Sequence, residues 1–247
     1  MRRLVVNIVL FSCSYLAIAQ SSDGFLSQSQ TKEKQVEDYF LESVDFDQYK
    51  IHLKTLTQKP HVAGSKANEE VRDYMANVMS NAGLKVELYP YDIYMSKNPG
   101  NSLIELVTPI REPLNQQEYI LEGDTYSSSS DLWKGWNAYS GSGDVTAEVV
   151  YANYGTKEDF EKLKELGVEV QGKIVLARYG QNFRGYKAKF AEDNGAAGLI
   201  IYTDPSDSGF TKGLVYPEGV YYNESAIQRG SVLTEDFTGD PLTPYEP

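Results

Sequence analysis

The segment Arg178–Gly185 holds the side chains of this sequence that are best suited to binding chemistry. Arg184 carries a planar guanidinium that can bind a carboxylate through paired N–H groups, and a helix N-terminus beside it would strengthen the attraction. A structural salt bridge would use the same side chain equally well. The sequence therefore leaves two roles open for Arg184, as a binder of carboxylates or as a structural cation.

Few other residues point to catalysis. The chain has 2 His and 1 Cys, which leaves little for a histidine-based metal site or a Ser-His-Asp triad. We expect His61 to be a loop histidine that hydrogen-bonds the backbone, with a catalytic role as the less favoured alternative, and His52 to be structural or solvated. No glycine-rich dinucleotide or phosphate loop and no His-Glu-x-x-His motif occurs. Asp204 and Asp207 could bind calcium, as could the acidic residues of 158–165, for which a solvated helix face is the favoured alternative.

The elements around Arg184 predict how it is positioned. The compact apolar runs Lys173–Arg178 and Gly198–Tyr202 predict strands, and Gly185–Asn194 predicts a short helix between them. A strand, helix and strand in so short a stretch predict a βαβ unit with parallel strands, in a domain of the α/β or α+β class. Arg184 then lies where the first strand ends and the helix begins, the usual location of binding residues in such units.

The flanking segments predict further elements. Before the βαβ unit, Val145–Asn153 predicts a strand, and Thr156 is expected to cap a charged helix. Lys32–Leu56 predicts two helices broken near Ser43, and a further helix is expected to be capped by Ser65, to end at Gly83 and to face a core with its apolar stripe. Strands are expected in Val86–Tyr94 and Ser102–Thr108. We place a domain boundary near residue 97.

The N-terminus predicts export. A basic start at Arg2 and Arg3, an apolar run and the Ala17-Ile18-Ala19 triplet indicate a secretory signal peptide that is cleaved between Ala19 and Gln20. The apolar run is shorter than the ~20 residues that span a bilayer, so we expect no transmembrane segment in the mature chain. The protein is predicted to be secreted or periplasmic. A lipid anchor on Cys13 is the minor alternative.

Charge and composition narrow the partners. With 23 Lys+Arg and 35 Asp+Glu, the formal net charge is -12, which excludes nucleic acid as the expected ligand because phosphate binding needs a basic face. The 19 tyrosines suit a peptide-binding or carbohydrate-binding surface, since tyrosine offers an amphipathic face at low entropic cost. Ordinary packing is the alternative for them.

Several motifs together resemble one family, that of glutamate carboxypeptidase II and the transferrin receptor, whose active members are dizinc exopeptidases with an inserted protease-associated (PA) domain. The motifs are His61–Ser65, Lys173–Gly180, Phe183–Gly185, Asn194–Gly198, Gln228–Gly230 and Gly239–Pro244. The resemblance implies the start of a zinc-exopeptidase α/β domain plus an inserted PA α+β domain with a βαβ core. The implied boundaries are a signal peptide at 1–19, an N-terminal lead and helix at 20–44, a partial peptidase domain at 45–96 and the PA, or apical, domain at 97–247.

The resemblance also implies site residues. Phe183 and Arg184 match the pair that lines the pocket for the C-terminal residue of the substrate, with the arginine on its carboxylate. Ser231 stands where the glutamate-selective enzymes have an asparagine, so the implied substrate is a peptide with a free terminal carboxylate and no stated side-chain preference. Thr243 matches a structural calcium ligand, although the tyrosine that accompanies it in the family is out of step at Tyr245.

Catalysis is expected to lie elsewhere. In the family, the ligands of both zinc ions and the general base follow the PA domain, whereas this sequence stops at Pro247 ahead of them. We therefore interpret the chain as the N-terminal fragment of a secreted zinc-dependent exopeptidase and expect the fragment alone not to hydrolyse peptides. The resemblance also allows a homodimer of the full-length protein, whose oligomeric state the sequence leaves open. The alternative hypotheses are a non-enzymatic PA module that binds peptides or proteins and, less favoured, a carbohydrate-binding protein.

Overall fold

The computed structural model describes residues 24–96, 98–235 and 245 of the chain. The predicted signal peptide, its cleavage site at Ala19 and Gln20, Cys13 and Thr243 lie outside the described residues. The chain divides into two compact units, Met1–Thr55 and Leu56–Pro247. No helix within the described ranges is long and apolar enough to cross a membrane.

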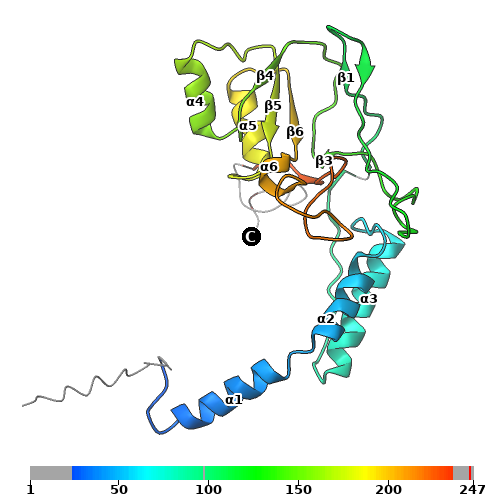
Figure 1. The fold of residues 1–247 in the computed structure, drawn as a ribbon, viewed down its shortest axis with the longest axis vertical. Coiled ribbons are helices and arrows are strands. Elements are labelled where there is room, and N and C mark those ends of the chain that lie inside the picture. The colour runs from blue at the N-terminus through cyan, green and yellow to red at the C-terminus, as the bar shows by residue number, and fades with distance from the viewer. Residues whose placement is uncertain (1–23, 97, 236–244, 246–247) are drawn as a thin grey trace, which may run out of the picture. The chain divides into compact units, whose positions relative to one another are not determined.

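The first unit holds helix α1 (Gln30–Glu42) and most of α2 (Phe46–Thr57), drawn in blue in Figure 1. This confirms the prediction of two helices broken near Ser43, which is the C-cap of α1. Neither helix buries a residue, and large apolar side chains such as Phe40 and Phe46 are exposed. These helices therefore form no core of their own among the residues described.

The second unit begins with the end of α2, followed by helix α3 (Lys66–Asn81). Ser65 caps α3 as predicted, because its Oγ accepts the N–H of Asn68 at 3.2 Å. The expectation that the apolar stripe of α3 faces a core is wrong for the described structure, in which α3 has no buried residue.

The stretch after α3 also differs from its prediction. Residues 86–94 form no strand, because a strand needs a hydrogen-bonding neighbour and no described segment pairs with them. The strand expected in Ser102–Thr108 shrinks to β1 (Glu105–Leu106), which pairs antiparallel with β2 (Glu112–Pro113).

A parallel sheet organises the rest of this unit (Figure 1). Its strands are β4 (Val149–Tyr151), β5 (Ile174–Arg178) and β6 (Gly198–Tyr202), with β5 in the middle. Helix α4 (Lys157–Glu165) follows β4, and α5 (Arg184–Asp193) joins β5 to β6. The predicted βαβ unit and the α/β class are thus confirmed. Short elements complete the fold: α6 (Pro205–Ser208), and the parallel pair β3 (Asn137–Ala138) and β7 (Gly230–Ser231).

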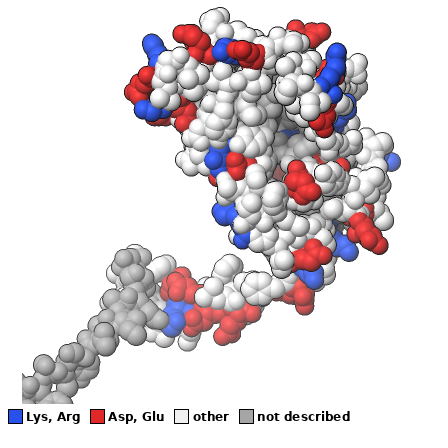
Figure 2. Space-filling view, turned by 45° about the horizontal axis from the view of Figure 1, so that its top comes forward, with Lys and Arg blue, Asp and Glu red and all other residues white. Residues whose placement is uncertain are grey.

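The core lies between this sheet and its helices. Val175 and Ala177 alternate along β5 and are completely buried, and Phe160 of α4 and Ala191 of α5 pack in the same cluster. Thr156 caps α4 as predicted, through a capping box with Asp159. Acidic and basic side chains are interspersed over the visible face of this unit in Figure 2.

Candidate functional site

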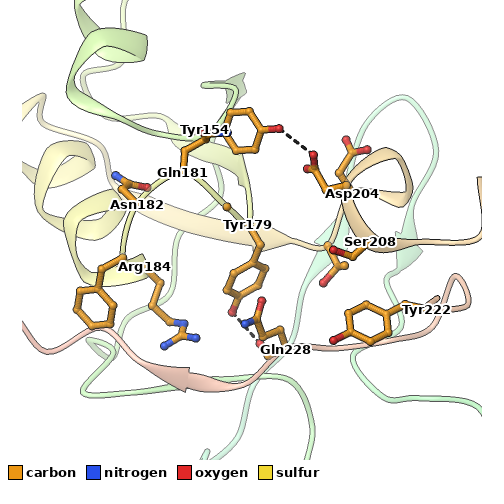
Figure 3. A pocket seen from close by; sticks show the side chains of 13 residues that line it. Tyr154, Tyr179, Gln181, Asn182, Arg184, Asp204, Ser208, Tyr222 and Gln228 are labelled. Carbon is orange, nitrogen blue, oxygen red and sulfur yellow. Dashed lines mark hydrogen bonds between the residues drawn. The ribbon is translucent and has the colours of Figure 1, made fainter. Parts of the chain in front are cut away.

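A pocket of about 600 Å³ lies at the carboxyl edge of the parallel sheet (Figure 3). All three strands contribute to it through the residues that follow them: Tyr154 after β4, the segment 179–184 after β5, and Thr203 and Asp204 after β6. Because parallel strands end at the same edge, side chains from distant parts of the sequence meet there. The pocket contains Phe183 and Arg184, two of the three predicted substrate-binding residues.

Arg184 is the first residue of α5 and is held between aromatic rings and backbone. Its guanidinium carbon lies 5.7 Å from the centre of the Tyr179 ring and 5.8 Å from that of Phe183. In Figure 3 the side chains of Tyr179 and Arg184 run toward Gln228. A Cβ at Gly230 would lie 2.3 Å from Arg184 Nη1, so the guanidinium fills the space in which any larger residue at 230 would place its side chain.

The charge of Arg184 has no anionic partner among the described residues, where no carboxylate forms an ion pair with it. Its Nε is buried and makes no hydrogen bond with any residue in the described ranges. The structural salt bridge therefore finds no support in the described part of the chain. A buried donor without a partner is unfavourable, and a ligand oxygen would satisfy it.

Ser231 lies beside this arrangement but does not line the pocket. It pairs with Ala138 across β3 and β7, and its Oγ accepts the N–H of Leu233 at 3.0 Å. Successive residues of a strand point to opposite faces, so Ser231 and the Gly230 position that adjoins Arg184 face opposite ways. A substrate-binding role for Ser231 stays a prediction.

Asn137, which sequence reasoning did not single out, lies beside this site through its strand pairing, although it does not line the pocket. It is the register partner of Gly230, so its side chain shares the face of the pair on which the Arg184 guanidinium lies. Its Oδ1 is buried and has no hydrogen-bond partner in the part of the chain that the structure describes. Nothing local in the sequence marks Asn137, because its position depends on pairing with a strand far along the chain.

A compact polar network forms the opposite end of the pocket. Arg178 Nε donates to Asp207 Oδ2 at 2.8 Å, and the Tyr154 hydroxyl donates to Asp207 Oδ1 at 2.8 Å. Asp204 accepts hydrogen bonds from Ser206 and from the Tyr202 hydroxyl, which lower the pKa of Asp204 to about 2. Arg178 thus supplies the cation for both carboxylates, and this argues against the calcium site considered for Asp204 and Asp207.

Two further contacts fix the position of β7. Arg229 binds Glu118 through paired hydrogen bonds, with Nη2 2.8 Å from Oε2, and its Nε donates to the Trp133 carbonyl at 3.1 Å. The Tyr179 hydroxyl donates to the Gln228 carbonyl at 2.7 Å. The Tyr179 contact joins the segment before β7 to the pocket loop, and the Arg229 contacts join it to the Glu118 and Trp133 segments.

The predicted metal chemistry has no centre in the described residues. They contain no group of three or more His, Cys, Asp or Glu side chains placed to hold one metal ion, so they do not fit a zinc site. His61 Nδ1 lies 3.0 Å from the Lys59 carbonyl oxygen, in line with the loop histidine expected there.

Comparison with known proteins agrees with this geometry. Residues 145–234, which contain the parallel sheet and the pocket, match the family model of the PA domain. The chain is 37% identical over 220 residues to "Glutamate carboxypeptidase 2 homolog" of Caenorhabditis elegans, covering 83% of this chain and 28% of that protein. It is 41% identical over 190 residues to "Probable glutamate carboxypeptidase" of Arthroderma benhamiae, covering 74% of this chain and 26% of that protein. It is 31% identical over 235 residues to "Aminopeptidase NAALADL1" of Rattus norvegicus, covering 90% and 31%.

Among solved structures, the chain is similar to "Aminopeptidase from Aneurinibacillus sp. strain AM-1", with a TM-score of 0.41, 22% identity and coverage of 77% of this chain and 35% of that one. The chain spans less than a third of the length of the curated relatives named above. On the sequence matches, the chain is similar over most of its length to proteins named glutamate carboxypeptidases, and residues 145–234 match the PA domain.

Proposed function

We propose that this chain forms the PA-domain wall of the substrate pocket in a secreted, zinc-dependent exopeptidase, and that Arg184 binds the terminal carboxylate of the peptide. The observation that carries the proposal is the state of Arg184. It lines a pocket, has no ion-pair partner among the described residues, and keeps a buried Nε without a hydrogen bond. A carboxylate would supply both the negative charge and the missing acceptor.

The surroundings of Arg184 suit this role. The rings of Tyr179 and Phe183 lie beside the guanidinium, with their centres 5.7 and 5.8 Å from its carbon. Phe183 is 41% exposed and offers an apolar surface to the side chain of the bound residue.

The remaining parts of the proposal concern the whole protein. The resemblance implies two zinc ions, and since the described residues do not fit such a centre, we assign no step of the hydrolysis to them. We expect this chain by itself to bind peptides without hydrolysing them. Export through the signal peptide, the calcium ligand Thr243, dimerisation of the full-length protein and the domain boundaries given above belong to the same proposal.

The test is a calorimetric titration of the whole chain with N-acetyl-alanyl-glutamate, N-acetyl-alanyl-leucine and the C-terminal amide of each. The carboxylates are expected to bind at least about tenfold more tightly than the amides, because a charged hydrogen-bonded pair is lost in the amide. Arg184→Met should abolish the difference. Arg72→Met, at an exposed arginine of α3, should retain it. Equal affinity for acid and amide, or an unchanged Arg184→Met variant, would contradict the role of Arg184.

A further inference from the structure

Lys187 is completely buried, although lysine is among the residues that are least often buried. It lies on α5, near Arg184 in the same helix. Its Nζ donates hydrogen bonds to the carbonyl oxygens of Tyr154 and Gly180 and to Asn182 Oδ1, the last two at 2.7 and 2.6 Å. All three N–H groups of the ammonium are therefore satisfied, without a direct ion pair among the described residues.

The partners of Lys187 all line the pocket. Tyr154 belongs to the turn after β4, whereas Gly180 and Asn182 belong to the loop that leads from β5 to Arg184. One buried amine thus connects two of the three loops that form the site. Lys187 also packs against the β4 turn, since a Cβ at Gly155 would lie 3.5 Å from Lys187 Cβ.

The loop held by Lys187 has an unfavourable backbone. Gly180 has φ +110 and Gln181 has φ +66, a left-handed conformation that residues with a Cβ rarely adopt. Gly180 is also the residue at which an added Cβ would lie 3.1 Å from the Tyr154 ring. The hydrogen bonds from Lys187 fall on the residues immediately before and after Gln181. They are therefore placed to compensate for the cost of this turn.

The charges around Lys187 make these hydrogen bonds dependent on pH. Burial lowers the pKa of Lys187 to about 8, while Asp159 of α4 opposes that change. The Tyr154 ring, 6.0 Å from Nζ, also adjoins the Arg178 guanidinium, and its hydroxyl is bonded to Asp207. A neutral amine has only two N–H donors for the three acceptors, so deprotonation of Lys187 breaks one of its three hydrogen bonds.

We propose that Lys187 is a positioning residue of this pocket, which holds the Gly180–Asn182 loop in the conformation that presents Phe183 and Arg184 to the ligand. The proposal rests on the peptide-binding function above and deepens it. It predicts that one buried amine, which touches no ligand itself, sets the affinity for the peptide carboxylate and its dependence on pH.

The first test is amide hydrogen exchange on the whole chain, comparing Lys187→Met with Lys189→Met. Lys189 lies on the same helix, where it pairs with Asp193 at the surface, and serves as the matched control. In Lys187→Met, the amide protons of residues 180–184 should exchange at least about tenfold faster than in the wild type, because the loop loses two hydrogen bonds. The exchange of the β6 amides should stay unchanged. In Lys189→Met, the amide protons of residues 180–184 should exchange as they do in the wild type.

The second test is affinity. Lys187→Met should bind N-acetyl-alanyl-glutamate at least about tenfold more weakly than the wild type, and the affinity of the wild type should fall above about pH 8 while that of the variant stays flat. If Lys187→Met does not fold, Asn182→Ala removes only one of the three Lys187 contacts, together with the hydrogen bond from Asn182 to the Gly155 carbonyl, and should show the same changes at a smaller size. Unchanged loop exchange, or a faster loop with wild-type affinity and pH profile, would overturn the proposal.

The two proposals fail separately. If the wild type binds none of the dipeptides, the peptide-binding function fails, and the exchange of residues 180–184 still decides whether Lys187 holds the loop. If the wild type binds them and both variants match it, Lys187 is a core residue without influence on the pocket.

Discussion

Lys187 and Asp159 bind the two backbone groups of one residue, the carbonyl and the N–H of Tyr154. The Lys187 ammonium donates to the Tyr154 carbonyl oxygen, and Asp159 Oδ2 accepts the Tyr154 N–H at 3.1 Å. Asp159 also accepts hydrogen bonds from Thr156 and Asn153. The turn after β4 is thus fixed between two partly or wholly buried charges of opposite sign, and it presents the Tyr154 ring to the pocket.

This relationship predicts the effect of removing the anion. Asp159→Asn should lower the pKa of Lys187 below about 8, because burial already disfavours the ammonium and Asp159 provides its opposing attraction. The measurement is a titration of the Lys187 Nζ resonance by NMR. Glu161→Gln, at an exposed residue of α4, is the control and should leave that pKa unchanged. A Lys187 pKa that does not move in Asp159→Asn would show that the carboxylate does not act on the amine.

Gly230→Ala should weaken binding of N-acetyl-alanyl-glutamate at least about tenfold, because the new Cβ would occupy the place of the Arg184 guanidinium and displace it. The thermal midpoint should change little, since the displaced atoms are the far end of a flexible side chain. Gly141→Ala is the matched control, as nothing lies within 4 Å of its Cβ position. Wild-type affinity in Gly230→Ala would mean that Arg184 binds from another position or not at all.

Thr156→Ala should destabilise the PA domain by about 1 kcal/mol in urea unfolding, because the Thr156 side chain makes the N-terminal cap of α4. Thr156→Ser keeps the hydroxyl and should recover most of the loss. If the serine variant is as unstable as the alanine variant, the threonine methyl group and not the capping box carries the effect.

Acid stability should depend on Asp204. Hydrogen bonds from Ser206 and Tyr202 lower the pKa of Asp204 to about 2, so its ionised form stabilises the fold above its ordinary pKa of about 4, and that contribution is lost as the pH falls from about 4 to 2. Asp204→Asn should therefore show a smaller drop in thermal midpoint between about pH 5 and pH 2.5 than the wild type. Equal drops in the two proteins would show that Asp204 is not linked to acid unfolding.

The sequence predicted the elements whose signals are local. The apolar runs of β5 and β6 and the caps at Ser65 and Thr156 depend on neighbouring residues, and the structure contains them as predicted. Residues 86–94 show the limit, since a partly alternating pattern does not supply the partner that a strand requires.

The site was predicted only in part for the same reason. Arg184 was found because it follows a recognisable strand and opens a helix. Asn137 depends on the pairing of β3 with β7, which no local pattern encodes. Lys187 lies in a helix rich in charged residues, where a lysine is expected at the surface, and only the fold shows its acceptors at Tyr154 and Gly180.

The most direct test of the account is the Nε–H resonance of Arg184, followed by NMR while N-acetyl-alanyl-glutamate is added to the whole chain. Because this Nε has no hydrogen-bond partner among the residues that the structure describes, its resonance should shift saturably as a carboxylate oxygen accepts from the guanidinium. The C-terminal amide at the same concentration should cause little shift. An Arg184 resonance that stays in place while the peptide binds would contradict the central claim.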